Sequence, residues 1–555
     1  MTDQIIDISL LIIRGFLPIL GFIILYGCFS SLRNHRRDNS PLIMLKNKST
    51  NISIPVMFWE NSIGRSKNSD IILPDPSVSR DHAVLFRRKE GWIIADTGSK
   101  LGVSVNGKKI TNPTQVYIND TITIGGSSLS IKKTDHKNEQ KNSWFFDNRR
   151  HKKSINPGLL LLEVTFFHFL MAIEIYFYTK KNIFACFTPF LSIGIISWLF
   201  FIITIFLIKR VSYELESLGI FLSGIGIILI GGENINKALI QSIALGIGLF
   251  MFCFLIWFIE DLDRAMRCRV IIAIAALFLF FANLVIGKEI NGSKNWIMLG
   301  PISIQPSEFI KIIFILYGTS TLDRLQTTKN LTGFIVFSAA CIGCLFLMRD
   351  FGTACVFFVT FLIISFMRSG SIRTVILSCS AAAIGAFMIL KFKPYIADRF
   401  AVWGHVWEYT QEGGYQQSRA LSYSASGGLL GVGAGNGKLK HIFAGMSDLM
   451  FGTVSEELGL LIAFIIALAI AFTAFFSRAV SIHSRSTFYS ISSCAAAGML
   501  VFQCCLNIFG TTDIFPLTGV TLPFVSLGGS SMVSVWGLLA IIKSSDEYTY
   551  AAQKK

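Results

Sequence analysis

The stretch "AGMSDLMFGTVSEELGLLIAF" (444–464) places Asp448, Glu456 and Glu457 directly before a long apolar run. The run reaches the roughly 20 residues that an α-helix needs to cross the hydrocarbon core of a bilayer. Carboxylates at the entrance of such a helix are costly unless something uses them. The stretch therefore indicates a membrane protein and marks three acids as candidates for chemistry.

The composition also favours a membrane protein. Of the 555 residues, 52% are hydrophobic and 15% are charged, whereas an ordinary soluble domain carries about 25% charged residues. The net charge of +16 comes from short basic clusters beside apolar runs, for example at 33–37, 149–153 and 264–269. This positive-inside pattern orients helices and does not indicate nucleic-acid binding. The 11 cysteines lie mostly within apolar runs, so we expect neither a disulfide framework nor a zinc site.

The chain changes character along its length. An apolar segment followed by a basic cluster predicts an uncleaved N-terminal anchor, and short alternating stretches separated by turn residues then predict a small β-sandwich. From residue 157 onward we expect twelve membrane helices. The predicted parts are an anchor (1–32), the β domain (40–135), a charged linker (136–156), two helices (157–213) and a larger membrane domain (214–543). The expected helices are 157–178, 183–208, 215–232, 238–258, 268–287, 308–321, 331–348, 352–368, 372–391, 456–477, 488–509 and 525–542.

The distribution of Lys and Arg predicts the orientation. If the first of these twelve segments starts in the cytoplasm, alternation puts the basic loops inside. We therefore expect a multi-pass protein of the cell membrane, with its N-terminus outside and its β domain and C-terminus in the cytoplasm. The segments 288–307 and 392–455 then lie outside. The second is too long for a bare connection, which makes it a candidate for function.

Residues 63–86 and 96–110 contain, in order, the elements GR, SRxH, GS and NG. This pattern resembles the forkhead-associated (FHA) family of phosphothreonine-binding modules. The resemblance implies a phosphate site, where charge-assisted donors are required, at Arg65, Ser79, Arg80 and Lys100. It also implies structural roles for Gly64, His82, Asn106 and Gly107. Where the family usually has Thr-Asn, this chain has Lys100-Leu101, so a protein–protein scaffold without phosphate binding is the alternative.

Three stretches of the membrane domain carry a second resemblance: 291–312, 414–438 with the following 448–459, and 515–533. Together they resemble the SEDS family, which comprises FtsW, RodA and SpoVE, over ten helices within 214–543. The anchor and the two helices at 157–213 add about three helices to the ten of the family. The resemblance implies a peptidoglycan glycosyltransferase that polymerises lipid II at the outer face of the membrane, with a class B penicillin-binding protein as partner.

The SEDS resemblance assigns Asp448 to the family's essential aspartate. A positioned carboxylate takes the proton of a sugar hydroxyl that attacks an anomeric carbon. Cations have to offset the charge of the pyrophosphate leaving group, either Lys and Arg or a divalent ion such as Mg²⁺ or Mn²⁺. The candidate substrate-binding or cavity residues are Trp296, Gln305, Ser307, Glu308, Lys311, Asp350, Arg399, Glu456 and Glu457.

Two departures from the family keep other functions open. The family usually has Pro-Glu-Ala-His-Thr before the aspartate, and this chain has "IFAGMS" (442–447); "RDFGTA" (349–354) replaces Pro-Asp-x-Gly-Thr. The alternatives are a lipid II transporter and a non-catalytic scaffold. A phosphothreonine protein or Ser/Thr kinase is the expected partner of the FHA domain. The sequence leaves a role in division, elongation or sporulation open.

Overall fold

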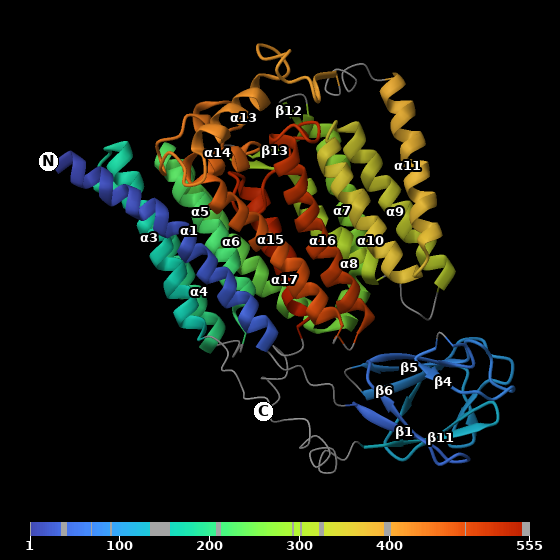
Figure 1. Cartoon of the computed structure of the whole chain (residues 1–555). Helices are drawn as coiled ribbons and strands as arrows, with labels where there is room; N and C mark the ends of the chain where they lie inside the picture. Colours follow the sequence, from blue (N-terminus) through green and yellow to red (C-terminus); the bar gives the residue numbers. More distant parts are fainter. Residues whose placement is uncertain are drawn as a thin grey trace.

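A helical bundle and a separate β-sandwich make up the protein (Figure 1). The computed structural model describes residues 2–34, 41–67, 69–88, 91–133, 156–206, 212–290, 293–299, 302–320, 327–392, 401–482, 484 and 486–546. The predicted linker at 136–156 lies outside the described residues except for Asn156, and so does the site candidate Arg399.

Helices occupy all the segments in which they were predicted. Within the described residues, nine helices are long and apolar enough to cross a membrane, and α9, α11 and α17 contain shorter apolar helices. The helices are α1 (Thr2–Asn34), α3 (Pro157–Thr179), α4 (Ile183–Phe206), α5 (Glu214–Glu233), α6 (Ile235–Glu260), α7 (Leu262–Ile286), α8 (Pro306–Ser320), α9 (Thr327–Leu347), α10 (Phe351–Ser369), α11 (Ile372–Phe392), α13 (Tyr415–Gly427), α14 (Met450–Glu457), α15 (Gly459–Ser481), α16 (Thr487–Thr511) and α17 (Gly529–Ser544).

Local chemistry explains where several helices begin. Asn156, Asn234 and Asp261 accept hydrogen bonds from the first backbone N–H groups of α3, α6 and α7, respectively, which satisfies donors that have no partner inside a helix. Several predicted boundaries differ by a few residues from those observed, and one difference affects the candidate site. The helix expected at 456–477 begins at Gly459, because Gly459 adopts φ +86° against the carbonyl oxygen of Leu429. Glu456 and Glu457 therefore belong to the separate helix α14.

The central helices α5 and α17 are surrounded by the rest of the bundle. All side chains of α17 are buried from Ser530 to Ser544, and the membrane-length window of α5 is fully buried. Trp536 packs edge-on against Phe252 and Phe524, and a Cβ at Gly219 would meet its ring. Close approach at glycine thus brings α5 against α17, as in many membrane bundles.

The two ends of the bundle differ. One end, which we call the loop end, carries α13, α14, the 3₁₀ turn η1 (Leu439–His441) and a small sheet of β12 (Lys288–Ile290), β13 (Ser293–Leu299) and β14 (Ile302–Ile304). The opposite end, the sandwich end, faces the β-sandwich (Figure 1). The helix α1 runs along α3, α5 and α15 between the two ends.

Residues 43–132 form the predicted all-β sandwich. The sheets have the strand orders β2-β1-β11-β10-β7-β8 and β4-β3-β5-β6-β9, and alternate apolar side chains such as Leu45, Leu85 and Ile122 fill the space between them. The strands are β1 (Ile43–Asn47), β2 (Ser53–Val56), β3 (Glu60–Gly64), β4 (Ile71–Ile72), β5 (Ala83–Arg88), β6 (Gly91–Asp96), β7 (Val103–Val105), β8 (Lys108–Lys109), β9 (Thr114–Val116), β10 (Thr121–Ile124) and β11 (Ser127–Lys132).

The sandwich contacts the bundle through one end of β3 and β5. Arg88, the last residue of β5, lies 3.3 Å from Asp263 in the first turn of α7 and 3.4 Å from Glu60. Trp59 packs edge-on against Tyr489 of α16, with ring centroids 6.0 Å apart. The contact therefore combines an ion pair with an aromatic pair.

Candidate active site

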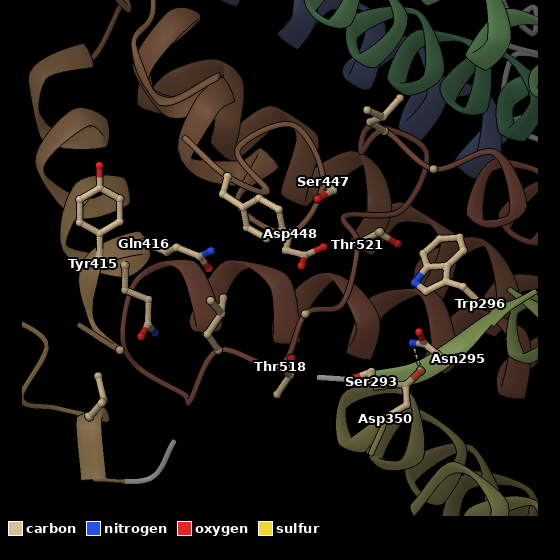
Figure 2. Close-up of a pocket in the computed structure, with 18 of the residues that line it drawn as sticks. Ser293, Asn295, Trp296, Asp350, Tyr415, Gln416, Ser447, Asp448, Thr518 and Thr521 are labelled. Atoms are coloured by element: carbon tan, nitrogen blue, oxygen red, sulfur yellow. Dashed lines mark hydrogen bonds between the residues drawn. The ribbon is translucent and has the colours of Figure 1, made fainter. Parts of the chain in front are cut away.

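A cavity of about 1060 Å³ opens at the loop end of the bundle. Its walls come from β13, β14, the start of α10, the start of α13, the residues before α14 and the 517–521 segment before α17. Segments from across the membrane domain therefore meet around one space. Of the predicted site residues, Trp296, Gln305, Asp350 and Asp448 line it. Figure 2 shows Asp448 between Ser447 and Thr521, with Trp296 and Asp350 on the facing wall.

Asp448 is half-buried and lies two residues before α14. Several hydrogen bonds fix the backbone around it. The Asn507 side chain in α16 donates a hydrogen bond of 2.8 Å to the Asp448 carbonyl and another of 2.8 Å to that of Val520. The Ser526 hydroxyl donates to the Ser447 carbonyl, and Leu527 N–H donates to that of Met446 at 2.8 Å. The chain that carries Asp448 is thereby fixed to α16 and to the segment before α17.

Asp350 lies across the cavity in a different environment. It is buried and accepts hydrogen bonds from Asn295 Nδ2 at 2.9 Å, Gln305 Nε2 at 3.3 Å and Thr353 N–H at 3.1 Å. The last bond caps α10 at its N-terminus, where a carboxylate is favoured. Three donors therefore hold the Asp350 carboxylate in the cavity wall, joining β13 and the residue before α8 to α10.

The predicted cavity residues Glu308, Lys311 and Ser307 do not line the cavity. All three are buried in α8, and Lys311 Nζ lies 2.7 Å from Glu308 Oε1 and donates to Gln503 Oε1 at 3.0 Å. Gln503 in turn donates to the carbonyl of Thr521, which does line the cavity. The ion pair expected from the i, i+3 spacing is present, but it lies behind the cavity wall because the helix carries it away from the opening.

The predicted pair Glu456–Glu457 is also outside the cavity lining, with exposures of 2% and 0%. Glu456 accepts from the backbone N–H groups of Lys438 and Leu439, both at 2.8 Å, and Glu457 accepts from Gly435 N–H at 2.6 Å. Burial raises the pKa of Glu457 above its usual range, and the nearby Lys440 ammonium opposes this shift. The two acids therefore fold the 435–440 segment onto α14.

In the sandwich, the predicted phosphate-binding residues meet at the end of β3 and β5 that lies away from the bundle contact. Arg65 N–H donates to the carbonyl of Ser79 at 3.0 Å, and Lys100 N–H donates to the Ser79 hydroxyl at 3.2 Å. The side chains of Arg65, Arg80 and Lys100 are exposed, so the loops at this end of the sandwich present three cations to solvent. Leu101 is 57% exposed in the position where the family has Asn.

The predicted structural residues of the sandwich hold these loops. The buried ring of His82 accepts from Ser79 N–H at 3.0 Å, and its other nitrogen lies 3.1 Å from the Gly102 carbonyl oxygen. A Cβ at Gly64 would collide with the Arg80 carbonyl. Asn106 and Gly107 both have positive φ in the β7–β8 turn, a conformation for which Asn-Gly is preferred.

Sequence reasoning missed Asn507 and Gln503. Both interrupt the otherwise apolar character of α16, and polar side chains inside a membrane helix are costly enough to indicate function. That signal was present in the sequence. Their partners, however, lie 13 to 192 positions away, and nothing local in the sequence identifies them.

The cavity carboxylates do not form a protein cage for a metal ion. Across the part of the chain that the structure describes, no three His, Cys, Asp or Glu side chains are grouped so that they would hold one. Asp350 is already bound by three N–H donors, and the other carboxylates of the described lining, Glu412 and Asp448, lie on different segments of the wall. The donor set therefore does not fit a metal held by the protein alone.

The fold and the cavity define a polytopic membrane protein with a polar site at one end and a β-sandwich at the other. Residues 220–551 match the FtsW/RodA/SpoVE family model, described as a cell cycle protein, and residues 61–125 match that of the FHA domain. The first match covers more than half of the chain. The chain belongs to the FtsW/RodA/SpoVE family and carries an FHA domain.

Relatives of this chain have been assigned an activity. It is 32% identical over 273 residues to a probable peptidoglycan glycosyltransferase FtsW of Buchnera aphidicola, covering 47% of this chain and 68% of the relative. It is 26% identical over 381 residues to a peptidoglycan glycosyltransferase RodA of Mycobacterium leprae, covering 63% and 81%. A chain from a solved peptidoglycan synthase complex matches with TM-score 0.51 and 24% identity over 61% of this chain and 97% of that chain. The structural match shows the shared fold.

Proposed function

We propose that this protein is a peptidoglycan glycosyltransferase that polymerises lipid II, and that its FHA domain regulates it. The observation that carries the proposal is the position of Asp448. The resemblance assigns it to the family's essential aspartate, and it lines a cavity of about 1060 Å³, slightly larger than the roughly 300–1,000 Å³ typical of ligand pockets. A cavity of that size suits the sugars of a lipid-linked substrate.

The chemistry assigned to Asp448 is general-base catalysis. The acceptor sugar hydroxyl transfers its proton to the carboxylate while its oxygen bonds to the anomeric carbon of the donor. The bond from that carbon to the lipid pyrophosphate breaks, and the pyrophosphate departs with the electron pair. Because this leaving group needs no proton, a single carboxylate suffices, unlike in glycoside hydrolysis. The Asn507 amide and the Ser526 hydroxyl donate hydrogen bonds to the carbonyls of Asp448 and Ser447, which hold the base in place.

The pyrophosphate charge has to be offset by cations. Among the described residues that line the cavity, none is Lys or Arg. Arg399 lies two positions before Ala401, which lines the cavity, so we propose it as a phosphate contact. A divalent ion would be the second source: the substrate phosphates and Asp448 would hold it, and it would offset the phosphate charge. Polymerisation assays separate these two sources. Loss of activity in Arg399→Ala protein would indicate the arginine, and loss of activity in EDTA that Mg²⁺ or Mn²⁺ restores would indicate a divalent ion.

The proposed topology puts the loop end outside the cell and the FHA domain in the cytoplasm. The basic loops support this orientation. The proposed partners are a class B penicillin-binding protein and a phosphothreonine protein or Ser/Thr kinase. Labelling of single introduced cysteines in intact cells should reach position 436, which is exposed at the loop end, and spare position 101 in the FHA domain. The opposite result would reverse the orientation.

Polymerisation of lipid II by the purified full-length protein in detergent distinguishes an enzyme from a transporter or a scaffold. Wild-type protein should make glycan polymer, and Asp448→Asn should fold normally yet make none, because the amide accepts no proton. Asp513→Asn is the matched control: this carboxylate is at the loop end, outside the cavity lining. Near-normal polymer from Asp448→Asn would refute the assignment of the base. Absence of wild-type activity even with the transpeptidase present would favour the scaffold.

A further inference from the structure

An ion pair joins two helices that the family match does not include. Arg14 of α1 and Glu174 of α3 lie outside the matched residues 220–551, and Arg14 Nε is 3.1 Å from Glu174 Oε1. Their side chains are 18% and 1% exposed. Burying two charges among membrane helices carries a desolvation cost that apolar residues would avoid. The pair therefore needs an explanation beyond the packing of α1 on α3.

Both members of the pair also contact the 431–435 segment at the loop end. Arg14 Nη1 donates to the Gly431 carbonyl at 3.3 Å, and the guanidinium stacks 4.9 Å from the centre of the Tyr178 ring. The Ala434 N–H lies near the Glu174 carboxylate, whose buried Oε2 has no hydrogen-bond partner among the described residues. A Cβ at Gly433, where φ is +108°, would collide with Tyr178 and come within 2.9 Å of Arg14 Nη2. The segment thus lies directly against the two extra helices.

The opposite side of this segment is bonded to α14. Val432 N–H donates to the Glu456 carbonyl at 2.9 Å, and Gly433 N–H donates to that of Glu457 at 3.0 Å. Gly435 N–H donates to the Glu457 carboxylate at 2.6 Å. The 431–435 segment is therefore clamped between the Arg14–Glu174 pair and the last turn of α14.

The proposed base directly precedes the same helix, α14. Asp448 lies two residues before α14, and Leu449 packs with Leu439 of η1 in a small apolar cluster. Leu439 is itself held by the Glu456 carboxylate, which accepts its N–H at 2.8 Å. Each contact on the path from the 431–435 segment to Asp448 is thus a hydrogen bond or a packed side chain.

We propose that Arg14 and Glu174 are positioning residues for the transferase site: they fix the 431–435 segment, and this segment fixes α14 and the base Asp448. The inference rests on the proposed function. It assigns a role to two helices outside the family match. Because α1 ends at Asn34 and the first FHA strand begins at Ile43, the helix that holds the site at the loop end also leads directly into the regulatory domain.

The decisive variant removes both charges at once. In full-length Arg14→Leu/Glu174→Leu protein, no unpaired charge remains and the helices keep an apolar contact, so the unfolding temperature should match wild type. The contacts to Gly431 and Ala434 are gone. We expect faster amide hydrogen exchange in peptides covering 428–441 and a loss of at least about tenfold in kcat for polymerisation, with KM little changed, since hydrogen bonds to charged groups hold the segment. Glu163→Gln, a change of the same kind in α3 but far from the loop end, should affect neither measurement.

A charge-swapped variant separates positioning from simple neutralisation. Arg14→Glu/Glu174→Arg restores the ion pair but presents an acceptor, not a donor, to the Gly431 carbonyl. Its kcat for polymerisation should therefore remain low, and amide hydrogen exchange in peptides covering 428–441 should remain fast. If either double variant has wild-type kcat and wild-type exchange, the proposal is wrong. If wild-type protein makes no polymer, the proposed function fails separately, and exchange alone decides: faster exchange supports positioning and unchanged exchange overturns it.

Discussion

Replacing Asn507 should lower kcat without unfolding the protein. Its side chain is 2% exposed and donates two hydrogen bonds of 2.8 Å, to the carbonyls of Asp448 and Val520. Asn507→Ala removes both donors. A hydrogen bond of this kind contributes about 0.5–1.5 kcal/mol net, so the two together hold the base segment with about 1–3 kcal/mol. If all of this energy serves to position the Asp448 carboxylate, its loss lowers kcat by roughly 5- to 150-fold.

The assay is steady-state polymerisation of lipid II by full-length protein, with kcat and KM measured separately. We expect the loss in kcat, because the substrate contacts in the cavity are unchanged. Thr511→Val is the matched control: it deletes a buried hydroxyl one turn further along α16, which donates a 2.7 Å hydrogen bond to the Asn507 carbonyl of the same helix. Equal kcat for Asn507→Ala and wild type, or an equal loss for both variants, would refute the reasoning.

Three further predictions concern other parts of the chain. Arg65→Ala should lower the affinity for a phosphothreonine peptide at least tenfold by calorimetry, because a charge-assisted bond of about 1.5–3 kcal/mol is lost; equal wild-type binding of plain and phosphorylated peptides would favour the scaffold alternative. Arg88→Glu should detach the FHA domain by placing a carboxylate opposite Asp263, seen as faster exchange at 257–266 with peptide affinity unchanged. Lys311→Met should destabilise the bundle by about 3–5 kcal/mol by isolating the buried Glu308, and adding Glu308→Gln should restore most of the thermal stability.

The sequence predicted the helices well because the bilayer limits the possible structures. A segment in lipid has to satisfy its own backbone hydrogen bonds, so an apolar run of sufficient length is a helix. The FHA sandwich was predicted from short alternating stretches between turn residues and from the family motif. Three residues of that motif, Gly64, Asn106 and Gly107, stand where the backbone permits few other residues. In both cases a local physical requirement restricts which residue types can occupy the positions concerned.

The candidate site was only partly predictable, since its contacts join distant positions. The Glu308–Lys311 pair follows from helical spacing, but its place behind the cavity wall depends on how α8 packs. The hairpin of β13 and β14, expected as part of an outer loop, forms by pairing Ile297 with Ile304. Arg14 and Glu174 are 160 positions apart, and no periodicity in the sequence relates them.

The separation of the two sites limits how the FHA domain can act on catalysis. The helix α15 has 23 residues and spans about 35 Å, so a phosphate at Arg65 is several Debye lengths of about 8 Å from Asp448. Direct electrostatic influence is therefore screened, and regulation has to travel through packed elements that contact both ends. The described residues offer two such routes: α1, which leads into the sandwich and holds Gly431 through Arg14, and α16, which meets Trp59 through Tyr489 and holds Asp448 through Asn507. Both routes end on the backbone that carries the proposed base, so we expect a displaced FHA domain to change the placement of Asp448 and not its charge.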